Sequence, residues 1–133
     1  MTTLLTDLNV TGNLNVTGTG PVVTTPVVSR TNRFTQSTSI TSTSSTTVVT
    51  APGASLFADL TNITITNTNT TTATIVTLTD GTVPVIYSIP AGGGIQISLS
   101  VPRKATTANT AWTLTCGTAV TTIYVVIDYV KVA

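Results

Sequence analysis

The sequence has 133 residues, a net charge of +1 and no histidine, and only 7% of its residues are charged. Nucleic-acid binding needs a basic face that neutralises phosphates, so this charge balance argues against a nucleic acid as partner. Threonine contributes 35 residues and serine 10, and both Thr and the abundant Val suit pleated strands. Because Glu is absent and Leu and Lys are scarce, composition predicts an all-β protein.

A tandem repeat lies near the start of the chain. The pentapeptide Leu-Asn-Val-Thr-Gly occurs at residues 8–12 and again at 14–18, a period of six residues. This period suits short β segments separated by glycine turns, which cannot bury their apolar side chains alone and need identical neighbours or a larger surface. We therefore expect residues 1–20 to be an attachment segment, with four apolar interface candidates: Leu8, Val10, Leu14 and Val16.

Residues 21–43 have the composition of an extended arm. They contain Pro21 and Pro26 and a Ser/Thr run, with few apolar anchors, so we expect a partner to order them. Arg30 and Arg33 are either solvated charges or docking residues for an acidic partner surface, since arginine is favoured at interfaces. With Phe34, they are the interface candidates of this arm.

Residues 44–133 read as successive short strands with turns between them. Asp80-Gly81 is the strongest turn signal, and Pro102 is expected to end a strand. Strands at this spacing are typical of an antiparallel β-sandwich, and we expect a jelly-roll-like one that follows the extended N-terminal arm. The expected strands are 46–50, 56–67, 73–79, 83–89, 95–101, 111–116 and 122–132.

Alternating apolar residues predict which faces form the core. Trp112, Leu114 and Cys116 share one face of their expected strand. In the strand 56–67, strict alternation places Leu60 with Asn62, on the face opposite Ile63. Two further apolar faces are expected, namely Ile95, Ile97, Leu99 and Val101, and Ile123, Val125, Ile127 and Tyr129.

The sequence offers little to catalysis. General acid–base chemistry usually needs His or paired carboxylates, and the four Asp residues are widely spaced. No group of metal ligands, phosphate loop or serine-nucleophile motif is found, and Cys116 has no His to activate it. We therefore predict no enzyme activity, no catalytic, metal or cofactor-binding residues and no cofactor. Asp80 is expected to stabilise the backbone of its turn with Gly81. Asp128 is expected to form a salt bridge with Arg103, Lys104 or a neighbouring subunit.

Neither a secretory signal nor a membrane span is expected. Leu4-Leu5 is followed by polar residues rather than an apolar stretch, and the longest apolar run near the end covers only residues 123–127. We therefore expect synthesis in a cytoplasm and no membrane partner.

Two stretches resemble virion proteins of tailed bacteriophages. Residues 8–18 resemble short repeats of tail fibres and other appendage proteins, in which parallel chains often wind together as trimers. Residues 44–132 resemble small Thr-rich β-sandwich modules of phage virions. The matching segments are 47–54, 63–68, 77–81, 90–94, 108–115 and 124–129.

This resemblance implies a structural virion protein without catalytic residues. Two repeats are too few for a long fibre shaft, which favours a capsid decoration (cement) protein. Such a protein would bind the major capsid protein on the outer capsid surface as a homotrimer and stabilise the shell, after synthesis in the host cytoplasm. The alternative is a short head or tail fibre whose sandwich binds a host receptor.

Overall fold

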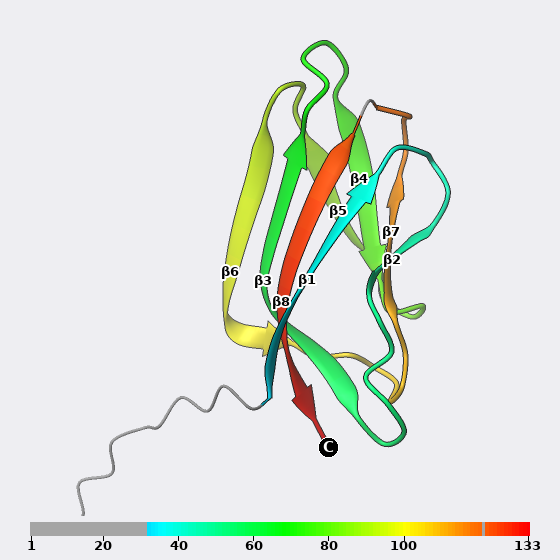
Figure 1. Cartoon of the computed structure of the whole chain (residues 1–133), viewed down its shortest axis with the longest axis vertical. Helices are drawn as coiled ribbons and strands as arrows, with labels where there is room; N and C mark the ends of the chain where they lie inside the picture. Colours follow the sequence, from blue (N-terminus) through cyan, green and yellow to red (C-terminus); the bar gives the residue numbers. More distant parts are fainter. Residues whose placement is uncertain (1–31, 121) are drawn as a thin grey trace, which may run out of the picture.

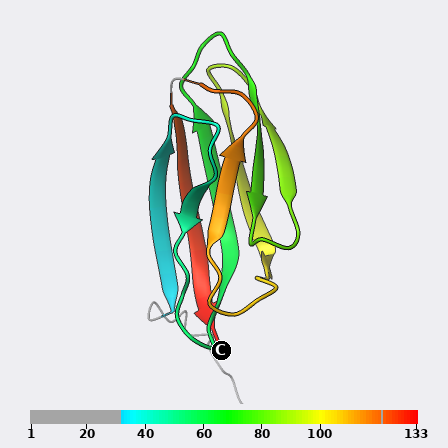
Figure 2. The same ribbon diagram turned by 90° about the vertical axis from the view of Figure 1, so that its right-hand side faces the viewer.

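The protein is a sandwich of two antiparallel four-stranded sheets (Figures 1 and 2). The computed structural model describes residues 32–120 and 122–133. Sheet A has the strand order β1 (Arg33–Ile40), β8 (Ile123–Val132), β3 (Phe57–Asn67) and β6 (Gly94–Arg103). Sheet B has the order β2 (Thr46–Val49), β7 (Trp112–Cys116), β4 (Thr74–Thr79) and β5 (Val85–Ile89). The all-β sandwich predicted from the sequence is confirmed.

The strand order is that of a rolled antiparallel ribbon. β1 pairs with β8, β2 with β7, β3 with β6 and β4 with β5, as if the chain were one long hairpin. Rolling this hairpin adds the pairs β3–β8 and β4–β7 and so produces the two sheets of a jelly roll. The tip of the hairpin is the predicted Asp80-Gly81 turn, where Gly81 has a φ of 92°, a value that glycine adopts without strain.

The first strand lies where the sequence predicted an arm. β1 pairs with β8 along its whole length, from Arg33 opposite Val130 to Ile40 opposite Ile123, so the expected sandwich boundary at residue 44 is wrong. The strand was missed because two of its inward positions hold polar residues, Gln36 and Thr38. One of them, Gln36, is satisfied across the sandwich, where its Oε1 accepts a hydrogen bond from the Thr50 N–H at 3.0 Å. The expected segment 1–20 lies outside the described residues.

Seven of the eight strands lie at the expected places, with two local differences. β6 continues through Pro102 to Arg103, because an edge strand has no neighbour on one side to which Pro102 would have to donate. Between the pairs Leu60–Arg103 and Asn62–Ser98, β6 has more residues than β3 and bulges outward. The bulge leaves Val101 73% exposed, so Val101 does not share the apolar face that was predicted for it.

The core lies between the two sheets and follows the predicted alternation in β7 and β8. In β3 the alternation is interrupted at Thr61, so Leu60 is buried with Ile63 while Asn62 lies on the outer face. The expectation that Leu60 and Asn62 share a face is therefore wrong, because a bulge inserts one residue and reverses the facing of the residues after it. The largest fully buried side chains are Trp112, Ile40, Leu60, Ile63, Ile65, Leu78, Ile89, Leu114, Ile123 and Ile127.

Trp112 joins the two sheets at the centre of this core. It lies on β7 of sheet B and is 1% exposed. Its indole Nε1–H donates a hydrogen bond of 2.8 Å to the carbonyl oxygen of Ala58 on β3 of sheet A. Trp112 therefore contributes both apolar burial and a cross-sheet hydrogen bond, which satisfies the polar group of a buried indole.

We expect Trp112→Ala to lower the free energy of unfolding by about 3–5 kcal/mol, because it opens a large cavity. Trp112→Phe retains most of the apolar volume but leaves the Ala58 carbonyl without its donor, so its loss should be smaller, about 1–3 kcal/mol. Urea denaturation followed by circular dichroism measures both. Equal stability of the alanine variant and the wild type would contradict this role.

Candidate functional site

Two of the four aspartates hold one loop, and each comes from a different sheet. Asp59 on β3 accepts a hydrogen bond from the Ala105 N–H at 2.9 Å. Asp80, directly after β4, accepts two bonds of 2.6 Å from Thr106, one from its N–H and one from its hydroxyl. Consecutive amides of the β6–β7 connection are thus fastened to both sheets. Because both carboxylates are buried and bonded internally, their role is structural.

The Asp80 carboxylate also organises its own turn, as the sequence predicted. Its Oδ1 accepts the N–H groups of Thr82 at 3.1 Å and of Val83 at 3.4 Å. Burial alone would raise the pKa of Asp80. The hydrogen bonds from Thr106, Thr82 and Val83 outweigh burial and hold that pKa below its ordinary value of 3.8.

Asp128 lies in a different environment, on the outer face of sheet A. Its Oδ1 accepts a hydrogen bond of 2.6 Å from the Thr35 hydroxyl of β1, and its backbone carbonyl accepts one of 3.0 Å from the Thr61 hydroxyl of β3. The expected partner Arg103 lies elsewhere, beside Tyr87. Burial raises the pKa of Tyr87, and the positive charge of Arg103 opposes part of this rise. Within the part of the chain that the structure describes, Asp128 is therefore held by hydroxyl groups.

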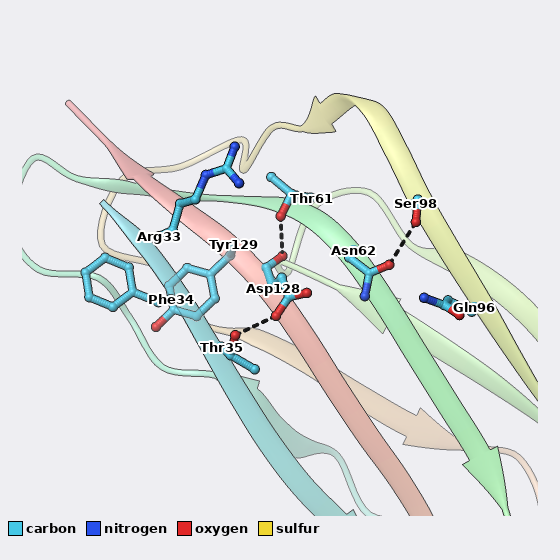
Figure 3. A pocket seen from close by; sticks show the side chains of 9 residues that line it. All are labelled: Arg33, Phe34, Thr35, Thr61, Asn62, Gln96, Ser98, Asp128 and Tyr129. Atoms are coloured by element: carbon cyan, nitrogen blue, oxygen red, sulfur yellow. Dashed lines mark hydrogen bonds between the residues drawn. The ribbon is translucent and has the colours of Figure 1, made fainter. Parts of the chain in front are cut away.

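The outer face of sheet A carries a depression with a volume of about 870 Å³ (Figure 3). All four strands of the sheet contribute to it. One row of the register crosses it from Thr35 through Asp128 and Asn62 to Ser98. The Asn62 Oδ1 accepts a hydrogen bond of 3.1 Å from the Ser98 hydroxyl. The lining residues are Arg33, Phe34, Thr35, Thr61, Asn62, Gln96, Ser98, Asp128 and Tyr129.

Aromatic packing fixes the end of the depression where β1 begins. The Phe34 ring stacks on Tyr129 with centroids 5.5 Å apart, and the Lys131 ammonium lies 4.4 Å from the Phe34 centroid. The Lys131 N–H also donates a hydrogen bond of 3.0 Å to the Asn32 carbonyl. These contacts hold the backbone of Arg33 against β8, so its side chain starts from a fixed place on the rim.

The predicted interface residues divide into two groups. Arg33 and Phe34 belong to the sandwich and line the depression on sheet A. The others lie outside the described residues, namely Leu8, Val10, Leu14, Val16 and Arg30. The depression itself was not predicted. Alternation along β6 places Gln96 and Ser98 opposite its apolar face, but only the register shows which polar residues meet across four strands.

Two further findings concern the described residues alone. In residues 32–120 and 122–133, no three His, Cys, Asp or Glu side chains gather as a metal site would require. Over the same ranges, no helix has the length and hydropathy needed to cross a membrane. Cys116 is buried as expected, and burial raises the pKa of its thiol.

Comparison with known proteins gives a weak likeness to a solved structure. No protein-family model matches the sequence, and no curated protein matches it. Among solved structures, a chain of the "Cyanophage Pam1 capsid asymmetric unit" is similar, with 15% sequence identity and a TM-score of 0.49. The likeness covers 86% of this chain and 96% of that chain. At these values it assigns neither a family nor a function.

We expect Asp80→Asn to lower the free energy of unfolding at pH 7 by about 1–3 kcal/mol, because an amide cannot accept from all the donors that face the carboxylate. The native pKa of Asp80 lies below its unfolded value, so the stability it contributes is present above about pH 4 and is lost as the pH falls through the native pKa. The difference between wild type and variant should therefore narrow as the pH falls below about 4.

Guanidinium chloride denaturation at several pH values measures this difference. Asp128→Asn is the matched control, since Asp128 is only half-buried and accepts one side-chain hydrogen bond. Its loss at pH 7 should be the smaller of the two. A difference between wild type and Asp80→Asn that stays constant with pH would contradict the role of the charge.

Proposed function

We propose that the protein is a structural component of a phage virion, and specifically a capsid decoration protein. It would bind the major capsid protein on the outer surface of the shell as a homotrimer and stabilise the particle. The observation that carries this proposal is the tandem pentapeptide at residues 8–12 and 14–18, placed ahead of a jelly roll. Such a repeat needs identical neighbours or a larger surface in order to bury its apolar side chains.

The sandwich provides a fixed point from which the repeat segment departs. The described chain starts at Asn32, beside Lys131 and near the C-terminus (Figure 1). The 31 residues ahead of it span at most about 100 Å. Arg33 and Phe34 lie at this exit point, at one end of the depression on sheet A.

The proposed mechanism is attachment by many weak contacts. The repeat would add short strands to exposed sheet edges of the capsid and bury Leu and Val there. Three arms in one trimer would bind together, so that modest single affinities combine into tight attachment. Bound across the seams between subunits, the trimers would oppose their separation. The internal roles of Asp59 and Asp80 accord with a protein whose task is mechanical.

Deletion of residues 1–20 tests the attachment. All eight strands begin after residue 32, so the truncated protein should retain the sandwich and its melting temperature. We expect it to be absent from particles assembled in its presence, whereas the full chain is incorporated. Gel analysis of purified particles measures this, and circular dichroism of the truncated protein is the control for folding. Incorporation of the truncated protein would show that the repeat is not the anchor.

Removal of the whole protein tests stabilisation. Particles assembled without it should release their genome at lower temperature and after milder osmotic shock than complete particles. Adding the purified protein back should restore the resistance. Particles that resist heat and osmotic shock equally well with and without the protein would overturn the stabilising role.

A further inference from the structure

The depression on sheet A contains hydrogen-bonding groups that the sandwich itself does not use. Within the described residues, the Gln96 amide and the Arg33 guanidinium make no side-chain hydrogen bond or ion pair. Among the residues that the structure describes, one oxygen of Asp128 accepts a hydrogen bond, from the Thr35 hydroxyl, and the other accepts none. The Asn62 Nδ2 makes a single long contact of 3.5 Å to Thr64. Polar groups from all four strands thus face one hollow with unused donors and acceptors.

These groups combine donors and acceptors over a short distance. Arg33 offers only donors, the free oxygen of Asp128 only accepts, and the amides of Asn62 and Gln96 do both. Arg33 and Asp128 line the same depression, and no ion pair joins them in the part of the chain that the structure describes. A ligand that uses these groups must therefore both donate and accept hydrogen bonds.

We propose that this depression binds an oligosaccharide. Each sugar hydroxyl donates and accepts a hydrogen bond, as the mixed set of groups requires, and planar amide and carboxylate groups can bond two hydroxyls at once. A nucleic acid would require a basic face, but here Asp128 balances Arg33. A volume of about 870 Å³ lies within the range of ligand sites, and the hollow is open, as entry of a chain requires.

The site continues along the sheet to an exposed aromatic residue. Tyr124 is 51% exposed and lies on the same outer face, between Ser39 of β1 and Thr66 of β3. It is four residues from Asp128 along β8, about 13 Å at strand spacing. Its ring offers an apolar face with a polar tip, which suits the apolar face of a pyranose. An extended oligosaccharide would therefore contact both Asp128 and Tyr124.

Binding without cleavage is expected at this site. Glycoside hydrolysis commonly uses two carboxyl groups on either side of the bond that breaks. Asp128 is the one carboxylate that lines the depression among the described residues, while Asp59 and Asp80 are buried at the β6–β7 connection. The proposal does not depend on shell stabilisation, because a protein attached through residues 1–20 can still present sheet A to an incoming ligand.

The full-length protein should be tested against immobilised neutral oligosaccharides, from mono- to hexasaccharides, followed by calorimetric titration with the best of them. We expect saturable binding that strengthens with chain length beyond the monosaccharide. Gln96→Ala, Asp128→Ala and Tyr124→Ala should each weaken binding, and Asp128→Ala by at least about tenfold because it removes a charged acceptor. The Gln96 side chain has no internal hydrogen bond within the described residues, so Gln96→Ala is the variant safest for folding.

Ile86→Ala is the matched control, because Ile86 is 65% exposed on the outer face of sheet B. It should bind like the wild type. Absence of saturable binding to every oligosaccharide would overturn the proposal. Binding that survives in all three sheet A variants, or that Ile86→Ala removes, would overturn the assigned location.

Discussion

The fold depends on two buried carboxylates that act from opposite sheets on neighbouring peptide groups. Asp59 of sheet A and Asp80 of sheet B hold the amides of Ala105 and Thr106. The connection they hold carries the chain from the edge strand β6 to β7 in the other sheet. Without such bonds, this crossing would leave the N–H of the buried Ala105 and one oxygen of each buried carboxylate without a partner, a costly arrangement in a low-dielectric interior.

Trp112 extends the same network into the core. It begins β7, shortly after the held connection, and its indole bonds to Ala58, the neighbour of Asp59 on β3. Two neighbouring residues of β3 therefore bond both to the β6–β7 connection, through Asp59, and to the Trp112 indole, through Ala58. Hydrogen bonds to buried polar groups and apolar packing act together here to stabilise a sandwich with few charges.

The two outer faces of the sandwich differ in chemistry. The described strands of sheet B present mainly Thr methyls and hydroxyls with Ile75 and Ile86, and no charge. Sheet A presents an acid, a guanidinium and two amides around one hollow. A face of the second kind can select a ligand by hydrogen bonding. If residues 1–20 attach the protein as proposed, this asymmetry would leave sheet A available for the proposed ligand.

Sequence patterns predicted much of the fold and little of the candidate site. Period-2 alternation located the apolar faces of β7 and β8 correctly, because each of these strands has one side in the core. β1 was missed because its inward residues Gln36 and Thr38 are polar, and because β8, the strand with which it pairs, is distant in sequence. The bulge at Thr61 reversed the facing of Leu60, which strict alternation cannot anticipate.

Local structure was accessible from the amino-acid sequence alone: an all-β chain, its turn at Asp80-Gly81, and most of the apolar residues that enter the core. These features arise from propensity and from alternation between neighbouring residues. The pairing of the strands became visible only in the folded chain, and with it the row formed by Thr35, Asp128, Asn62 and Ser98. Sheet register could not be predicted because it arises from contacts between segments that are distant in sequence. The depression is lined by all four strands of sheet A, so it forms only when these strands pair in the folded protein.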